Sequence, residues 1–220
     1  MFGLSEKNLL YSWDILNHLK YETEIAYESL KRIFESQDEF SNKAVMKFEN
    51  NAKSRFDFQN EDTFRSHDRE ERVLDNLIRW QGYSIILSSL ALFETIIKKI
   101  CIEINTEFEF GFIFPKNNHL QAYKGFLNKN LQIRIEKKKF KQFVDFKLVR
   151  NAIAHDGYIS KDKIEKAKNL GLKVLLSEDG NVITFENFIL LEHLIEDMQH
   201  FLRNLFDQID IKFKIRKDIS

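Results

Sequence analysis

The chain has 220 residues with a formal net charge of zero, and 43% of them are hydrophobic, a share that supports a folded core. Its seven glycines and single proline favour long helices over short strands joined by tight turns. The one cysteine, Cys101, excludes an intramolecular disulfide framework and a thiolate zinc site, and a reducing compartment is the simplest match.

The first expected element is a helix over residues 5–36, where apolar side chains recur at helical spacing. Residues 36–71 are polar with scattered phenylalanines, and the pattern leaves open whether they form a helix, a loop or both. The strongest predicted helix spans residues 73–105 and carries a continuous apolar seam with spacings of four and three. The seam consists of Ile86, Leu90, Phe93, Ile97, Ile100 and Ile104.

Glu94 lies beside this seam. Burying a lone carboxylate costs roughly several kcal/mol, so we expect Glu94 to have a partner and a structural role, with a catalytic role as the alternative. The apolar stretch 83–104 is long enough to span a bilayer, but four charged residues within it make insertion costly. The N-terminus lacks the pattern of a signal peptide. These features predict a cytoplasmic protein that does not associate with a membrane.

Further along the chain, Asn117 or Asn118 can cap a short helix that ends near Asn130. A helix is expected from Lys137 to His155, with Gly157 suited to a left-handed cap. Residues 173–176 and 182–185 flank a turn-forming sequence, and a final helix follows over 186–209. The fold class predicted is therefore all-α: an antiparallel helical bundle with one small β-hairpin near 172–186. The predicted organisation is an N-terminal extension (1–72), a bundle (73–210) and a C-terminal tail (211–220).

The charge is distributed unevenly along the sequence. Residues 1–75 hold 16 acidic and 11 basic side chains, whereas residues 124–150 hold nine basic and two acidic ones, a local charge of +7. Such a segment is either a solvated helix face or a surface that binds phosphate.

The +7 segment leads directly into Arg150-Asn151, which is followed by His155 at the predicted helix end. On a helix, Asn151 and His155 share a face, whereas Arg150 and His155 are about 140° apart. One helix therefore does not focus both side chains on one phosphate, but two helices meeting across a two-fold axis could. The helix dipole favours a protonated imidazole at this end. Alternatively, Arg150 and His155 only complement the dipole and cap the last carbonyls.

The Arg-Asn pair and the four-residue gap to His155 resemble the signature of the HEPN family (higher eukaryotes and prokaryotes nucleotide-binding). The helix end, the glycine, the hairpin and the final helix are also similar to that family, over about residues 73–209. The resemblance implies a HEPN-type bundle and a homodimer whose cleft lies at the dimer interface. It further implies cleavage of RNA without a metal or other cofactor, in a toxin, a phage-defence effector or an RNA-processing factor.

In the chemistry that the resemblance implies, the ribose 2′-hydroxyl attacks the adjacent phosphorus and leaves a cyclic phosphate and a 5′-hydroxyl. His155 would act as general base or acid, Arg150 would stabilise charge on phosphorus, and Asn151 would orient the phosphate or the histidine. The expected substrate-binding residues are Lys138, Lys139, Lys147 and Tyr158.

Some HEPN toxins carry a tyrosine two positions after the histidine, and a partner nucleotidyltransferase antitoxin modifies it. Here Gly157 occupies that position and Tyr158 follows one residue later, so this partnership stays open. The competing function is a non-catalytic helical module for dimerisation or partner binding. His193, Asp197 and His200 share one face of the last helix, which we interpret as a boundary row rather than a metal site.

Overall fold

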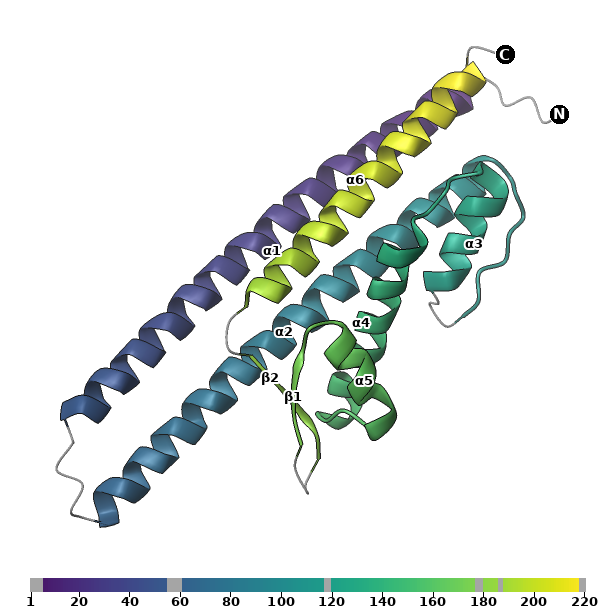
Figure 1. Ribbon diagram of the computed structural model, residues 1–220. Helices are drawn as coiled ribbons and strands as arrows, with labels where there is room; N and C mark the ends of the chain where they lie inside the picture. Colours follow the sequence, from purple (N-terminus) through teal and green to yellow (C-terminus); the bar gives the residue numbers. More distant parts are fainter. Residues whose placement is uncertain (1–5, 55–60, 117–119, 177–179, 186–187, 218–220) are drawn as a thin grey trace. The chain divides into compact units, whose positions relative to one another are not determined.

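The computed structural model describes residues 6–54, 61–116, 120–176, 180–185 and 188–217. Figure 1 shows the helices and the small sheet that precedes the last helix. The elements are α1 (Glu6–Ser54), α2 (Glu61–Glu107), α3 (Leu120–Leu131), α4 (Lys137–Asp156), α5 (Lys161–Asn169), β1 (Lys173–Leu175), β2 (Val182–Thr184) and α6 (Ile189–Lys217). The strands are antiparallel, with Val174 opposite Ile183.

The predicted all-α class with a small hairpin is confirmed. The predicted cap at Asn117 or Asn118 and the tip of the hairpin turn lie outside the described residues.

The polar stretch that the sequence left open is helical over most of its length. α1 continues to Ser54 and α2 begins at Glu61. No glycine or proline interrupts residues 36–54. Oppositely charged side chains four apart further support the helices, as in Glu39–Lys43, whose Oε1 and Nζ atoms are 2.6 Å apart.

The apolar seam predicted on α2 is confirmed, because its six members are each no more than 1% exposed. Because the seam is buried against other elements, this hydrophobic stretch belongs to the folded core. In the part of the chain that the structure describes, no helix carries an apolar run sufficient to cross a bilayer.

Two elements differ from the sequence prediction. α6 extends to Lys217, past the predicted end at residue 209 and into the predicted tail. α5 was not predicted: only two of its nine residues, Ile164 and Ala167, are apolar, so its apolar pattern is too short to identify a helix from the sequence.

The chain forms two compact units, and α1, α2, α4 and α6 each contribute residues to both. The first unit contains residues 1–29, 89–144 and 194–220, and the second contains residues 30–88 and 145–193. The predicted division at residue 72 falls inside α2 and inside the second unit.

The core of the first unit is aromatic. Phe93 of α2 lies against Phe143 of α4 and Phe201 of α6, with ring centroids 4.7 and 5.6 Å apart. The segment after α2 is held by Asn105, whose side-chain amide donates to the Phe112 carbonyl at 3.0 Å and accepts from the Phe112 N–H at 2.9 Å. An amide side chain thus supplies the backbone partners that this extended segment needs.

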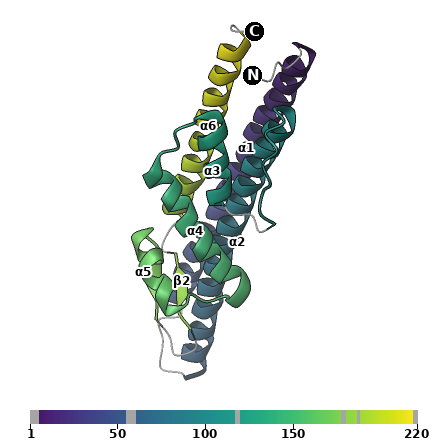
Figure 2. The same ribbon diagram turned by 90° about the vertical axis from the view of Figure 1, so that its right-hand side faces the viewer.

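The core of the second unit joins α2 to the hairpin. The Tyr83 ring packs edge-on against Phe185, which in turn contacts Phe188. The Tyr83 hydroxyl oxygen accepts a hydrogen bond of 3.1 Å from the Ile183 N–H. Figures 1 and 2 both show the hairpin and α5 next to each other in this unit. The hairpin is therefore anchored on α2.

Candidate functional site

The C-terminal half of α4 presents one buried side and one polar side. The buried side consists of Phe146, Val149, Ala152 and Ile153. The polar side carries Lys147, Asn151 and His155, spaced four residues apart, and we call these three residues the α4 ridge. Lys147 and Asn151 are half-buried, and His155 is exposed. The ridge spans about 12 Å along the helix axis and leaves the imidazole accessible to a ligand.

Arg150 lies beside the α4 ridge rather than on it. It is half-buried and lies five positions before His155 in the same helix. Since each residue turns the helix by about 100°, the two side chains leave α4 about 140° apart. One α4 helix therefore directs the guanidinium and the imidazole to different sides.

The end of the motif helix is fixed by Gly157. Its φ of +69° is left-handed, as predicted for this glycine, and its N–H donates to the Ile153 carbonyl at 3.0 Å. Two residues later the Ile159 N–H donates to the Asn181 carbonyl at 2.7 Å, and the Asn181 side chain returns a bond of 3.0 Å to the Ile159 carbonyl. The hairpin thus holds the segment that follows His155.

Tyr158 projects between these two anchors and is 44% exposed. Its ring lies against the backbone of Gly180, because a Cβ atom added there would be 2.5 Å from Tyr158 Cδ1. Burial raises the pKa of the neighbouring Tyr83, and Tyr158 raises it further, which places the two phenols within electrostatic reach. The sequence predicted the hairpin but not its role in positioning Tyr158.

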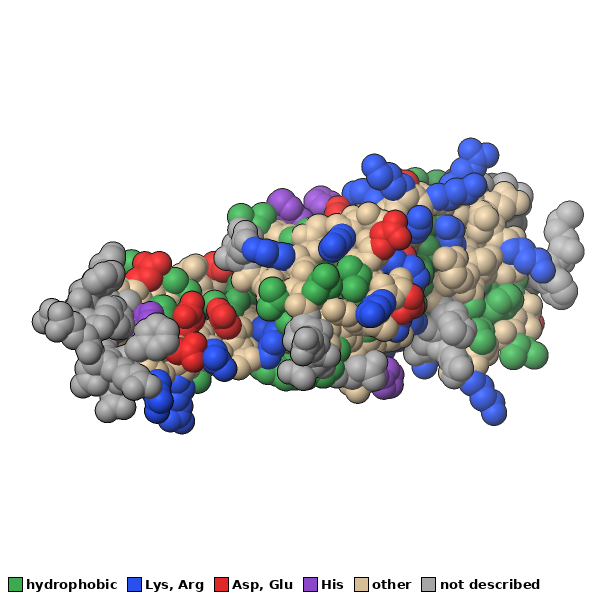
Figure 3. Space-filling model, turned by 60° about the horizontal axis from the view of Figure 1, so that its bottom comes forward, with side chains coloured by type: hydrophobic (Ala, Val, Ile, Leu, Met, Phe, Trp, Pro, Cys, Tyr) green, Lys and Arg blue, Asp and Glu red, His purple; other side chains and the backbone are tan. Residues whose placement is uncertain are grey.

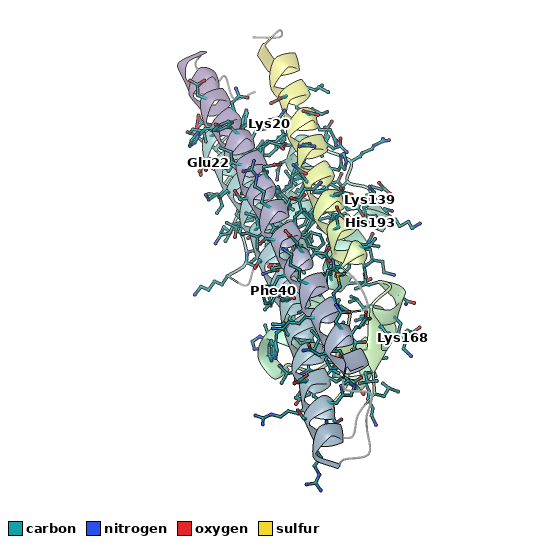
Figure 4. All side chains as sticks on the ribbon, turned by 90° about the vertical axis from the view of Figure 1, so that its left-hand side faces the viewer. Lys20, Glu22, Phe40, Lys139, Lys168 and His193 are labelled. Atoms are coloured by element: carbon teal, nitrogen blue, oxygen red, sulfur yellow. The ribbon has the colours of Figure 1, made fainter. Side chains whose placement is uncertain are left out.

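The lysines expected to bind substrate have different surroundings. Lys138 is exposed, whereas the Lys139 Nζ lies 3.1 Å from Asp197 Oδ1 of α6 (Figure 4). Both lysines belong to the first unit, whereas the α4 ridge belongs to the second. On the face in Figure 3, Lys and Arg side chains are scattered among acidic and uncharged ones.

A second group of basic side chains follows the motif and was missed by sequence reasoning. It comprises Lys161, Lys163, Lys166 and Lys168 of α5, in the same unit as the α4 ridge. The basic segment of the sequence was taken to end at Arg150, so these lysines were not considered. The pattern that could have revealed them is the series of lysines that follows Ser160 at intervals of two or three residues.

Glu94 is only 8% exposed, in the first unit. Burial raises the pKa of Tyr123 on α3, and the nearby Glu94 carboxylate raises it further. Glu94 therefore lies within electrostatic reach of Tyr123 and belongs to the first unit, whereas the α4 ridge belongs to the second. The structural role expected for Glu94 stays a prediction.

Two pockets in the first unit, of about 120 and 450 Å³, are lined by no residue of the α4 ridge. Over the described ranges, no three His, Cys, Asp or Glu side chains gather closely enough to hold a metal. Asp197, one member of the row on α6, pairs with Lys139 instead.

Comparison of the chain with protein-family models, with curated proteins and with solved structures finds no match.

Proposed function

We propose that the protein is a metal-independent endoribonuclease of HEPN type, acting as a toxin or a phage-defence effector. The observation that carries the proposal is the Arg150-Asn151-x-x-x-His155 sequence at the end of α4, with the imidazole exposed and the helix end closed by Gly157. These are the groups needed to move a proton and to stabilise charge on a phosphate.

In the proposed reaction a neutral His155 takes the proton of a ribose 2′-hydroxyl as its oxygen attacks the adjacent phosphorus. The bond from phosphorus to the 5′-oxygen breaks, and a protonated imidazole donates a proton to that leaving oxygen. The products are a 2′,3′-cyclic phosphate and a 5′-hydroxyl. Arg150 contacts the phosphate oxygens as negative charge develops on them, which a planar guanidinium suits. Asn151 lies beside His155 on the α4 ridge and orients the phosphate.

The proposal includes a homodimer. Because one α4 directs Arg150 and His155 about 140° apart, a second chain is needed to place an arginine and a histidine on the same phosphate. Two copies of His155 would also supply both the base and the acid. Tyr158, the exposed phenol nearest the motif, would contact RNA or accept modification by a nucleotidyltransferase antitoxin.

The test is RNA cleavage by purified protein in excess EDTA. His155→Ala is expected to reduce the rate by roughly 10²- to 10⁴-fold, and Arg150→Ala by about 10²-fold or more. His200→Ala, at an exposed histidine of α6, is the matched control and should cleave like wild type. Circular dichroism should show an unchanged fold for each variant.

The outcome that refutes the mechanism is an inactive wild type on several RNAs, or activity that EDTA abolishes. Cleavage that survives His155→Ala refutes the residue assignment. The second candidate, a non-catalytic module for dimerisation or partner binding, is favoured by one specific observation: the second unit exposes large apolar side chains on α1 and α2.

A further inference from the structure

In the second unit, α1 and α2 run antiparallel, and the sides on which they face each other are defined by two contacts. The Ser41 hydroxyl donates to the side-chain oxygen of Gln81, and the Phe48 ring stacks on His67 with centroids 4.8 Å apart. As the residue number rises along α1, the contacting residue number falls along α2, as an antiparallel pair requires.

Next to this contact, the two helices expose large apolar side chains. Ile33 and Phe40 of α1 are 54% and 56% exposed, and Val73 and Trp80 of α2 are 61% and 58% exposed. Gln37 and Leu77, one turn before Phe40 and Trp80, are half-buried. We call these six residues the α1–α2 face. Figure 4 labels Phe40 on α1.

Helix geometry puts the six residues on the same side of the pair. Phe40 precedes Ser41 by one residue, and Trp80 precedes Gln81 by one. In antiparallel helices, one step toward the N-terminus turns both side chains by about 100° to the same side of the pair. Ile33 and Val73 each lie seven residues, close to two whole turns, before Phe40 and Trp80, so they share that side.

The three residues of the face on α1 form one stripe and the three on α2 form another, and a local two-fold axis relates the two stripes. Positions 33, 37 and 40 on α1 have the same spacing as 73, 77 and 80 on α2, and the helices run in opposite directions. Rotation by 180° between Phe40 and Trp80 therefore exchanges one stripe with the other. A surface with this symmetry presents the same apolar pattern to a second copy in either orientation.

We propose that the α1–α2 face is a homodimer interface, in which a second copy packs its own face against it as a four-helix arrangement. None of the six members carries a charge, so two copies meet without repulsion or the burial of an unpaired ion. The four exposed side chains present roughly 450 Å² of apolar surface, since residues of this size carry on the order of 150–250 Å² each. That area matches the apolar share of a standard interface, about 800 Å² per partner of which somewhat more than half is non-polar.

The proposed function also includes a homodimer, in which two α4 helices meet. The contact through the α1–α2 face is a separate inference and does not depend on ribonuclease chemistry. It rests on exposed side chains of α1 and α2, whereas the proposed function rests on Arg150 and His155 of α4. An active nuclease that does not dimerise through this face would overturn the present inference alone. A dimer of inactive protein would overturn the proposed function alone.

The experiment is sedimentation equilibrium of the full chain from 1 to 100 µM. Wild type is expected to be a dimer, and Phe40→Glu with Trp80→Glu is expected to raise the dissociation constant by at least about a hundredfold, because each charge would be buried at the interface. Ile113→Glu is the matched control: Ile113 is an apolar residue of the first unit that is 90% exposed, and its variant should dimerise like wild type.

Circular dichroism and thermal unfolding check that the double variant is folded. If it is not, the milder pair Ile33→Ser and Val73→Ser, at the two ends of the face, should weaken the dimer by about tenfold or more. A monomeric wild type throughout this range would overturn the inference and leave the face to another partner. A folded double variant that still dimerises like wild type would overturn it as well.

Discussion

Gly180 shows how one residue of the hairpin controls a side chain next to the motif. Its φ is +138°, a backbone conformation that residues with a Cβ rarely adopt, and the Tyr158 ring occupies the space where a Cβ would lie. Tyr158 follows His155 by three residues, across the left-handed Gly157. The position of the phenol therefore depends on a glycine in a different element.

Gly180→Ala is expected to lower the free energy of unfolding by about 1–3 kcal/mol, because it adds backbone strain and displaces Tyr158. Urea denaturation followed by circular dichroism measures this change. Gly125→Ala is the control: nothing lies within 4 Å of its added Cβ, so alanine inside α3 should raise stability by about 0.5–1 kcal/mol. Equal effects at the two glycines would contradict the packing of Tyr158 on Gly180.

Burial sets the protonation state of two other side chains. Burial raises the pKa of the Cys101 thiol and of the Tyr27 phenol, so both stay protonated at neutral pH. Both side chains are at most 1% exposed. They serve as packing groups of the first unit, and the Cys101 thiol is not available as a nucleophile.

At the scale of elements, α1 and α6 are joined in the first unit by a paired carboxylate. Glu24 accepts bonds of 2.7 and 2.6 Å from Arg203 Nε and Nη2, and one of 3.0 Å from Gln199. The bond from Arg203 is the main cause that holds the pKa of Glu24 below its ordinary value of 4.5. A lowered folded-state pKa stabilises the fold above the unfolded-state pKa, and this stability is lost as the pH falls through the folded-state pKa.

Glu24→Gln is expected to lower the free energy of unfolding by about 0.5–1 kcal/mol near neutral pH, a modest effect because solvent screens this partly exposed pair. The difference from wild type should be constant above about pH 6 and should shrink as the pH falls below 4.5. Denaturant melts from pH 3 to pH 8 test this. Glu39→Gln, which breaks an exposed pair within α1, serves as the comparison and should show less pH dependence. A Glu24 effect that grows at acid pH would contradict the assignment.

For the whole molecule, the net charge of zero conceals basic segments that differ in availability. Lys138 is exposed, Lys139 is paired with Asp197, and four lysines of α5 lie in the same unit as the α4 ridge. Under the proposed function, RNA would therefore contact particular lysines rather than a uniform positive field.

Lys138→Ala is expected to weaken RNA binding and to reduce the slope of log affinity against log salt by about 0.7–1. Lys139→Ala should change both less, because its ammonium is already matched by a carboxylate. Fluorescence anisotropy with a labelled RNA from 50 to 200 mM salt measures both quantities. A larger effect at Lys139 than at Lys138 would contradict the ion pair as the reason for the difference.

Local patterns determined much of this protein from its sequence alone. The buried seam of α2, the span of α4, the left-handed Gly157 and the hairpin were predictable, because each follows from side-chain periodicity or from the conformational preference of a single residue. The motif was also visible in the sequence, since Arg150, Asn151 and His155 are close along the chain. Its chemistry remains a proposal.

Contacts between distant segments were decided only by the tertiary structure. The polar half of α1 is helical where Ser41 meets Gln81, forty residues away, and periodicity within either segment does not show that contact. The Lys139–Asp197 pair and the Tyr158–Gly180 packing likewise join different elements. The exposure of Phe40 and Trp80 is of the same kind: whether an apolar side chain on a helix is covered depends on what packs beside it, and the sequence of that helix alone does not contain this information.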